Sequence, residues 1–274
     1  MKILFYGNCQ TEAAMNALAA RNPKIKCEYA GNSRRVIKYN PERTTELMEW
    51  CDHIVTQPVM NLENPDHHDV LRARFAGRIT FMPYLWLDGL YSLCGAPGAR
   101  VLKGTSGAKG HSGVIGEEIV IAHIKSNGLA QTVADFRSGA LDFGHRKRFD
   151  DSLAELERRE ESADIKVAAQ IRNGYRDRVV MLTHNHPHPL IVNDIAQQIA
   201  DRLNLSFKPI LPDEYLRYST ITLPEFGKVL SPYTISDLGL KIPYDLQWLK
   251  IGRGFIADIA SSMGISGGRK RVEG

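Results

Sequence analysis

The sequence predicts an α/β fold built on a parallel sheet, and three observations lead to this prediction. Short apolar runs alternate with helical stretches of about ten residues as far as residue 82, which is the pattern of successive β-α-β units. Glycine or proline follows most of these runs, as expected for buried strands bounded by turns. Polar residues follow the first, third and fourth runs, at the carboxyl ends of strands, where ligands bind in such sheets.

The elements of the N-terminal region follow in chain order from composition and turn residues. We expect strands at 2–6, 25–30, 53–57 and 77–82, separated by helices at 11–20, 41–50 and 66–75. Alanine, methionine and leucine dominate the first of these helices, and they favour helix. Pro41 suits the first turn of its helix. Pro58 and Pro83 end the third and fourth strands, because proline cannot donate a hydrogen bond to a sheet.

The central region is predicted to be mostly helical. Helices are expected at 114–126, 129–137 and, as one long amphipathic helix, 150–170, followed by a strand at 178–183 and a helix at 189–203. Five prolines interrupt the chain after about residue 206, which indicates a loop-rich C-terminal region. We therefore expect a single α/β domain over residues 1–274, with a helical insertion at about 111–172 and a loop-rich extension at about 206–274.

Composition and charge narrow the class of protein. The 274 residues are 43% hydrophobic and 24% charged, as in soluble globular proteins. The net charge of +4 is too small to indicate nucleic-acid binding. The N-terminal apolar run is too short for a signal peptide, and no segment approaches the ~18 apolar residues of a membrane span. Four cysteines without C-x-x-C spacing favour a reduced, cytoplasmic protein without a zinc finger. The oligomeric state is left open.

The stretch Gly7-Asn8-Cys9-Gln10 follows the first predicted strand and opens a helix. If Asn8 caps that helix, Cys9 lies in the first turn. Free backbone N–H groups and the helix dipole stabilise a thiolate there, so we expect Cys9 to have a lowered pKa and to be nucleophilic. The same N–H groups could bind an oxyanion. The alternative is that Cys9 is a small residue packed in a tight turn.

The stretch THNHPHP, residues 183–189, places three histidines between a strand and a helix. One of them could act as a general base at the carboxyl end of the sheet. A metal site is a second interpretation, because His184 and His186 would point to one side of an extended segment, but further ligands are not evident. In a third interpretation the histidines only cap a loop.

Two basic stretches could contact an anionic ligand. Residues 103–118, KGTSGAKGHSGVIGEE, combine Lys103 and Lys109 with four glycines ahead of a helix, and backbone N–H groups in such a loop can bind phosphate. The spacing is not that of a Walker sequence, and a flexible loop is the alternative. His111 and Ser112 stand at the helix entry. After the second strand, Arg34, Arg35 and Lys38 form a basic group that could bind phosphate or be solvated.

Taken in order, GNCQ, IVTQPV, GHSG and NHP over residues 1 to about 205 resemble the WcbI-type polysaccharide biosynthesis family. The resemblance implies a CoA-dependent acetyltransferase of capsule assembly, which moves an acyl group from acetyl-CoA to a sugar hydroxyl. It also implies an active site containing Cys9, Gln10, Gln57, His111, Ser112, Asn185 and His186. The family pattern departs at Gly110, where a tyrosine is common, and in the loop after Pro83, where a histidine is common.

The resemblance also extends to SGNH-type esterases, in which a nucleophile after the first strand meets a late histidine. The expected core is therefore Rossmann-like or SGNH-like. We expect His186 to be the general base, with Asn185 fixing its loop, and Cys9 to be either the acyl-accepting nucleophile or a polar wall beside the thioester. Backbone N–H groups at residues 9 and 10 and the Gln57 amide would stabilise the oxyanion.

The residues that would bind the cofactor are Asn8, Ser112 and the cations Arg34, Arg35, Lys38, Lys103 and Lys109, because CoA carries phosphates that arginine and lysine bind. The expected partners are a CoA thioester and a sugar or polysaccharide acceptor, with no metal, no nucleic acid and no membrane insertion. Two other functions are left open: a thiol esterase of SGNH type, and a non-catalytic protein that binds a nucleotide or sugar.

Overall fold

The computed structural model describes residues 1–32, 39–60, 63–91, 115–208, 230–244 and 246–265. These residues form two compact units, each described by itself. Unit 1 comprises Met1–Trp86, Ser152–Tyr175 and Asn185–Thr220, and unit 2 comprises Leu87–Asp151, Arg176–His184 and Ile221–Gly274. The expectation of a single domain with an insertion at 111–172 stays a prediction, because compactness alone does not decide whether two units fold together.

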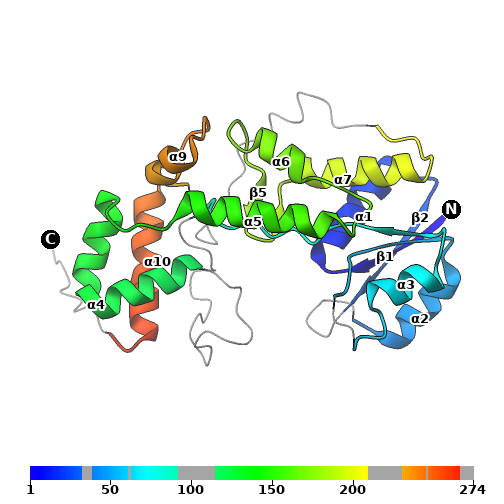
Figure 1. Cartoon of the computed structure of the whole chain (residues 1–274), viewed down its shortest axis with the longest axis horizontal. Coiled ribbons are helices and arrows are strands. Elements are labelled where there is room, and N and C mark those ends of the chain that lie inside the picture. The colour runs from blue at the N-terminus through cyan, green and yellow to red at the C-terminus, as the bar shows by residue number, and fades with distance from the viewer. Residues whose placement is uncertain (33–38, 61–62, 92–114, 209–229, 245, 266–274) are drawn as a thin grey trace. The chain divides into compact units, whose positions relative to one another are not determined.

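A four-stranded parallel sheet forms the centre of unit 1 (Figure 1) and confirms the α/β class. Its strands are β1 (Lys2–Gly7), β2 (Lys26–Gly31), β3 (His53–Thr56) and β4 (Ile79–Phe81), in the order β2-β1-β3-β4. Ile3 of β1 lies between Cys27 of β2 and His53 of β3. The chain leaves β1 toward one neighbour and returns to the other, so the carboxyl ends of β1 and β3 flank the crevice where ligands bind in such sheets.

Helices α1 (Cys9–Arg21), α2 (Pro41–Trp50) and α3 (His68–Arg74) pack on the sheet of unit 1. Helices α6 (Ala168–Gly174) and α7 (Pro189–Arg202) also belong to unit 1 (Figure 1). Leu47 of α2 and Leu71 of α3 pack against Leu4, Ile54 and Phe81 of the strands in one buried cluster. Helix α1 contacts α7 as well as β1 and β2. The packing of α1 on α7 therefore brings the turn between β1 and α1 close to the residues that precede α7.

Helix α5 (His145–Glu160) begins in unit 2 and ends in unit 1. The predicted helix at 150–170 is wrong at its centre, because α5 ends at Glu160 and α6 begins at Ala168. The Glu160 carboxylate accepts the N–H groups of Val167, at 2.5 Å, and Ala168, at 2.8 Å. Asp164 and Phe81 of β4 exchange hydrogen bonds. Polar side chains thus hold this segment against the sheet edge instead of in a helix.

Unit 2 contains α4 (Ile115–Ser138), α9 (Pro232–Leu238), α10 (Trp248–Ser262) and the strand β5 (Met181–Thr183). Gly128, with φ of +79°, separates two helical segments of α4, which agrees with the two helices expected at 114–126 and 129–137. The described C-terminal residues are not mainly loop, because α9 and α10 occupy most of 232–262. At Gly252 a Cβ atom would lie 2.2 Å from the Phe136 ring, so glycine allows α10 to pack against α4.

No helix in the described part of the chain combines the length and apolar character that crossing a bilayer requires. The remaining strand, β6 (His186–Pro187), belongs to unit 1 and carries one of the residues predicted for the site.

Candidate functional site

The turn between β1 and α1 has the predicted helix cap. The Asn8 side chain accepts the N–H of Gln10 at 2.9 Å, so Cys9 is the first residue of α1. Gly7 is required by close approach, because a Cβ atom there would lie 2.2 Å from Thr11 Oγ1 and 3.2 Å from Gln57 Oε1. The turn consequently places Cys9 at a helix N-terminus, at the carboxyl end of β1 and next to β3.

The Cys9 thiol faces the imidazole of His186. Cys9 Sγ lies 3.6 Å from His186 Nε2, and both residues are exposed. They are 177 positions apart in the sequence, and the packing of α7 on α1 brings their elements together. Of the three histidines between 183 and 189, the structure therefore selects His186 as the partner of Cys9. A thiol within hydrogen-bond reach of a histidine is the arrangement of an activated nucleophile.

The Gln10 side chain forms hydrogen bonds that connect the segment before His186 to the loops at the carboxyl end of the sheet. Its side chain is buried, with 2% exposed, and its amide nitrogen donates to the carbonyl oxygens of Leu85, at 2.7 Å, and Asn185, at 2.6 Å. Its amide oxygen accepts the N–H of Leu85 and the Gln57 amide, each at 3.0 Å. All four hydrogen-bonding positions of this amide are used. Gln10 thus joins the segments that follow β1, β3, β4 and β5.

Gln57, at the end of β3, is buried and engaged on both sides. Its amide nitrogen donates to Gln10, and its oxygen accepts the backbone N–H of Asn8 at 3.3 Å. The Gln10 N–H is likewise engaged with Asn8. The Gln57 amide and the Gln10 N–H, both predicted as oxyanion donors, therefore hold the turn in this structure. The helix N-terminus leaves the Cys9 N–H facing the Cys9 sulfur.

The electrostatics of Cys9 differ from the prediction. Burial raises the pKa of the thiol, and nearby Glu12 acts in the same direction. The backbone N–H groups of Cys9 and Gln10 lower it, as a helix N-terminus should, but the net shift of the pKa is upward. The predicted lowered pKa is wrong, because the helix effect was visible in the sequence and the partial burial of the thiol was not. A raised pKa favours the neutral thiol, which needs a base to become a nucleophile.

Tyr84 is a residue of the candidate site that the motifs did not identify. It follows Pro83, after β4, and its side chain makes a hydrogen bond with Asn185, next to His186. Burial raises the pKa of the Tyr84 phenol, and a negative charge on Cys9 acts in the same direction, which places the phenol in the electrostatic field of the thiol. Its position directly after a strand, in the loop following β4, was the available signal.

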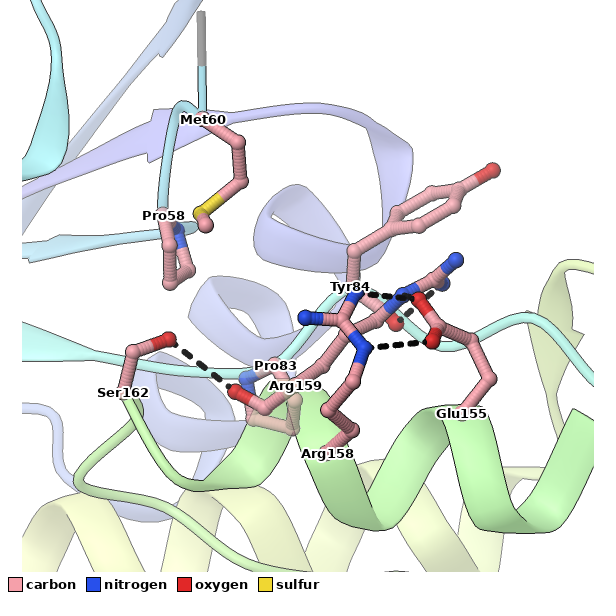
Figure 2. Close-up of a pocket in the computed structure, with 8 residues that line it drawn as sticks. All are labelled: Pro58, Met60, Pro83, Tyr84, Glu155, Arg158, Arg159 and Ser162. Carbon is pink, nitrogen blue, oxygen red and sulfur yellow. Dashed lines mark hydrogen bonds and ion pairs between the residues drawn. The ribbon is translucent and has the colours of Figure 1, made fainter.

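A pocket of about 390 Å³ adjoins Tyr84 (Figure 2). It is lined by Pro58, Met60, Pro83, Tyr84, Glu155, Arg158, Arg159 and Ser162, all in unit 1. Arg159 donates to the Tyr84 carbonyl oxygen at 3.3 Å and lies over the Tyr84 ring at 5.4 Å. The last turns of α5 and the ends of β3 and β4 thus build one polar cavity with an apolar wall.

Comparisons with known proteins give this site a context. The family model described as "Polysaccharide biosynthesis enzyme WcbI" matches residues 2–208. The chain belongs to the WcbI family. A solved WcbI structure has the same fold, with a TM-score of 0.62 and 17% sequence identity over 98% of this chain and 95% of that one. That protein is described as a novel polysaccharide biosynthesis enzyme, in its native form without a disulfide bond between CoA and one of its cysteines. No curated protein matches the sequence.

Several of the predicted catalytic and cofactor-binding residues lie outside the described residues. They are Arg34, Arg35, Lys38, Lys103, Lys109, His111 and Ser112. Their assignments stay predictions. Among the predicted site residues that are described, Cys9, Gln10, Gln57, Asn185 and His186 are brought together with Asn8.

His188, another histidine of the 183–189 segment, has a structural role. His188 is fully buried and caps α7, its Nδ1 accepting the N–H of Leu190 at 3.3 Å, which matches the loop-cap interpretation. Among the described residues of this WcbI-family chain, the one group of potential metal ligands is His67, His68 and Asp69, at the start of α3. It includes no histidine of the 183–189 segment.

Proposed function

We propose that the protein transfers an acyl group from a CoA thioester to a sugar hydroxyl. Membership of a family of polysaccharide biosynthesis enzymes supports a sugar acceptor. The description of the similar WcbI structure mentions a disulfide bond between CoA and a cysteine, which that native form lacks, and this mention supports CoA as the donor. The observation that carries the proposal is the 3.6 Å approach of Cys9 Sγ to His186 Nε2 at the N-terminus of α1.

In the first half-reaction His186 Nε2 takes the proton of the Cys9 thiol. The thiolate attacks the thioester carbonyl carbon, and the negative charge moves to the carbonyl oxygen. The Cys9 N–H at the start of α1 is positioned to stabilise that oxyanion. Collapse of the intermediate breaks the bond from carbon to the CoA sulfur, and the imidazolium returns the proton to that sulfur. CoA leaves as a thiol, and the acyl group stays on Cys9.

In the second half-reaction His186 takes the proton of the acceptor hydroxyl. The sugar oxygen attacks the acyl-Cys9 carbonyl, and the bond from carbon to Sγ breaks. The imidazolium then protonates the departing Cys9 sulfur, so the dyad returns to its neutral state. The raised pKa of Cys9 fits this scheme, because a neutral thiol activated by a base resembles a serine–histidine pair more than a resting thiolate.

The surrounding residues position the dyad. Gln10 binds the carbonyl oxygen of Asn185 and so holds the residue before His186. Gln57 fixes the Asn8 turn from the other side, and the Tyr84 hydroxyl engages Asn185. For the CoA phosphates we propose the cations Arg34, Arg35 and Lys38, with Lys103 and Lys109, because guanidinium and ammonium groups bind phosphate.

Calorimetric titration with CoA, combined with turnover of acetyl-CoA, tests the proposal. We expect micromolar CoA binding that weakens when Arg34 and Arg35 are both replaced by alanine. His186→Gln should lower turnover about 100-fold or more, as loss of a general base does, and leave the affinity for CoA within about twofold. Full turnover by His186→Gln would refute the assignment of the base, and no CoA binding up to millimolar concentration would refute the donor.

A thiol esterase is the second candidate, and the exposure of both Cys9 and His186 is the observation that favours it, because water can reach the acyl group. The two functions differ only in the acceptor. We expect acetate release from acetyl-CoA to be slow without sugar. Release that is fast and unaffected by any added sugar would favour the esterase.

A further inference from the structure

The pocket between the loops after β3 and β4 and the end of α5 has no role in the chemistry of the dyad itself. We propose that this pocket binds the sugar acceptor, and that the acceptor carries an anionic group, either a carboxylate or a phosphate. This inference rests on the proposed acyl transfer and adds the location and chemical class of the second substrate.

The first argument is that Tyr84 belongs to both the pocket and the Cys9 centre. Its side chain lines the cavity, and its hydroxyl makes a hydrogen bond with Asn185, beside His186. In Figure 2 that hydroxyl points away from Pro58 and Met60. A ligand in the pocket is therefore bounded by the same ring whose hydroxyl contacts Asn185, the residue before His186.

The second argument is the charge of the polar wall. Glu155 bridges the two arginines, with Arg158 Nε at 2.7 Å and Arg159 Nε at 2.8 Å from its oxygens. Arg158 holds the pKa of the Glu155 carboxyl down to about 2, so the carboxylate stays ionised at any working pH. Two guanidinium groups and one carboxylate leave one net positive charge, which an anionic ligand would neutralise.

The third argument is that the two guanidinium groups keep N–H donors with which an anionic ligand could form hydrogen bonds. Arg158 uses Nε and Nη2 for Glu155, and Arg159 uses Nε for Glu155 and Nη1 for Tyr84. Within the described part of the chain, Arg158 Nη1 and Arg159 Nη2 make no hydrogen bond. Figure 2 shows the Arg158 guanidinium between Glu155 and the Pro58–Met60 side of the cavity. Glu155 thus pre-orients the arginines, as planar anion recognition requires.

The fourth argument is the volume of the pocket and the mixture of apolar and polar residues that line it. A cavity of about 390 Å³ suits a small-molecule ligand and holds one sugar unit with its substituent. Pro58, Met60 and Pro83 supply apolar surface to the cavity. A sugar presents both apolar C–H faces and polar hydroxyls, so this mixture of walls matches it better than an all-polar or all-apolar ligand.

The test is binding of small sugars to the full-length protein in the presence of CoA, measured by saturation-transfer NMR and calorimetry. The probes are methyl β-glucuronide, glucose 1-phosphate and the neutral methyl β-glucoside. We expect at least one anionic probe to bind about tenfold or more tightly than the glucoside, since charge-assisted hydrogen bonds are the stronger ones. The anion that binds more tightly distinguishes a carboxylate acceptor from a phosphate acceptor.

Arg158→Gln should weaken binding of the anionic probe about tenfold and leave CoA affinity unchanged, and Arg158→Lys should restore part of it. The matched control is Arg172→Gln, because Arg172 also pairs with a glutamate, Glu157, on the surface of unit 1 but does not line the pocket. Arg172→Gln should change neither affinity. A thermal melt of each variant checks that it is folded.

Three results would overturn the inference: equal binding of all three probes, unchanged sugar binding in Arg158→Gln, or loss of CoA binding in that variant. The last result would assign the pocket to the donor and leave the acyl-transfer proposal standing. Absence of CoA binding by the wild-type protein would instead refute the donor, while sugar binding measured without CoA would still test the pocket.

Discussion

The replacement Gln10→Met tests whether the Gln10 amide holds the site together. Methionine is unbranched and close to glutamine in size, so the change removes hydrogen bonds with little change in volume. Four are lost: two donated to the carbonyl oxygens of Leu85 and Asn185, and two accepted from Leu85 N–H and Gln57. At about 1 kcal/mol for each bond, the free energy of unfolding should fall by about 4 kcal/mol.

Urea denaturation measures that loss directly, and the same change should lower the melting temperature by about 8–16 °C at roughly 2–4 °C per kcal/mol. The control is Gln197→Met, because the Gln197 amide nitrogen makes one exposed hydrogen bond, to Asp201 of the same helix, and should cost less than about 0.5 kcal/mol. Gln10→Met should also lower turnover, since Asn185 loses its anchor. A Gln10→Met protein as stable as the control would refute the positioning role.

Three further predictions concern the turn, the thiol and unit 2. Gly7→Ala should lower the free energy of unfolding by about 1–3 kcal/mol, because the new methyl group would meet Thr11 Oγ1; urea denaturation equal to wild type would contradict this. Alkylation of Cys9 by iodoacetamide should rise with pH and reach half its maximum above the pKa of free cysteine, because burial raises the Cys9 pKa; a rate already maximal at pH 7 would indicate a resting thiolate. Asp88→Ala should lower the free energy of unfolding by about 3–5 kcal/mol, because it removes the carboxylate that lies 2.5 Å from the buried Arg148 guanidinium. A melting temperature equal to that of the wild type would contradict this.

The sequence was sufficient for the parallel sheet, and it indicated several residues of the candidate site. Alternating strands and helices, bounded by glycine and proline, predicted β1 to β4 and their helices. The Asn8 cap followed from local rules and is confirmed by its hydrogen bond to Gln10. Selecting His186 among three histidines required a resemblance, because the 3.6 Å approach to Cys9 depends on the packing of α7 against α1.

Tertiary environment explains what the sequence did not predict. The Cys9 pKa depends on how much protein surrounds the sulfur, and no local pattern contains that information. The predicted helix at 150–170 is interrupted because the Glu160 carboxylate accepts the Val167 N–H and the Asp164 carboxylate accepts the Phe81 N–H of β4. The spacing of apolar residues contains no information on either hydrogen bond. Helix α10 was not predicted because the five prolines after about residue 206 indicated loops, although none of them lies within Trp248–Ser262.

One available signal was also overlooked. Ser231 followed by Pro232 is a favourable start for a helix, and Gly239 is a favourable end. In the structure the Ser231 hydroxyl accepts the N–H of Thr234 at 3.0 Å, and Gly239 has a left-handed conformation. Helix α9 could therefore have been predicted from start and stop residues, even in a region rich in proline.

The most direct test of the central claim is to mix the protein with acetyl-CoA, without a sugar, and to measure acetylation of Cys9 by mass spectrometry over time. The account predicts one acetyl group on Cys9 and one CoA released per chain, with acetylation about 100-fold slower in His186→Gln. Acetyl transfer to sugar that proceeds at the normal rate in Cys9→Ala, with no acetyl group on the wild-type thiol, would contradict it.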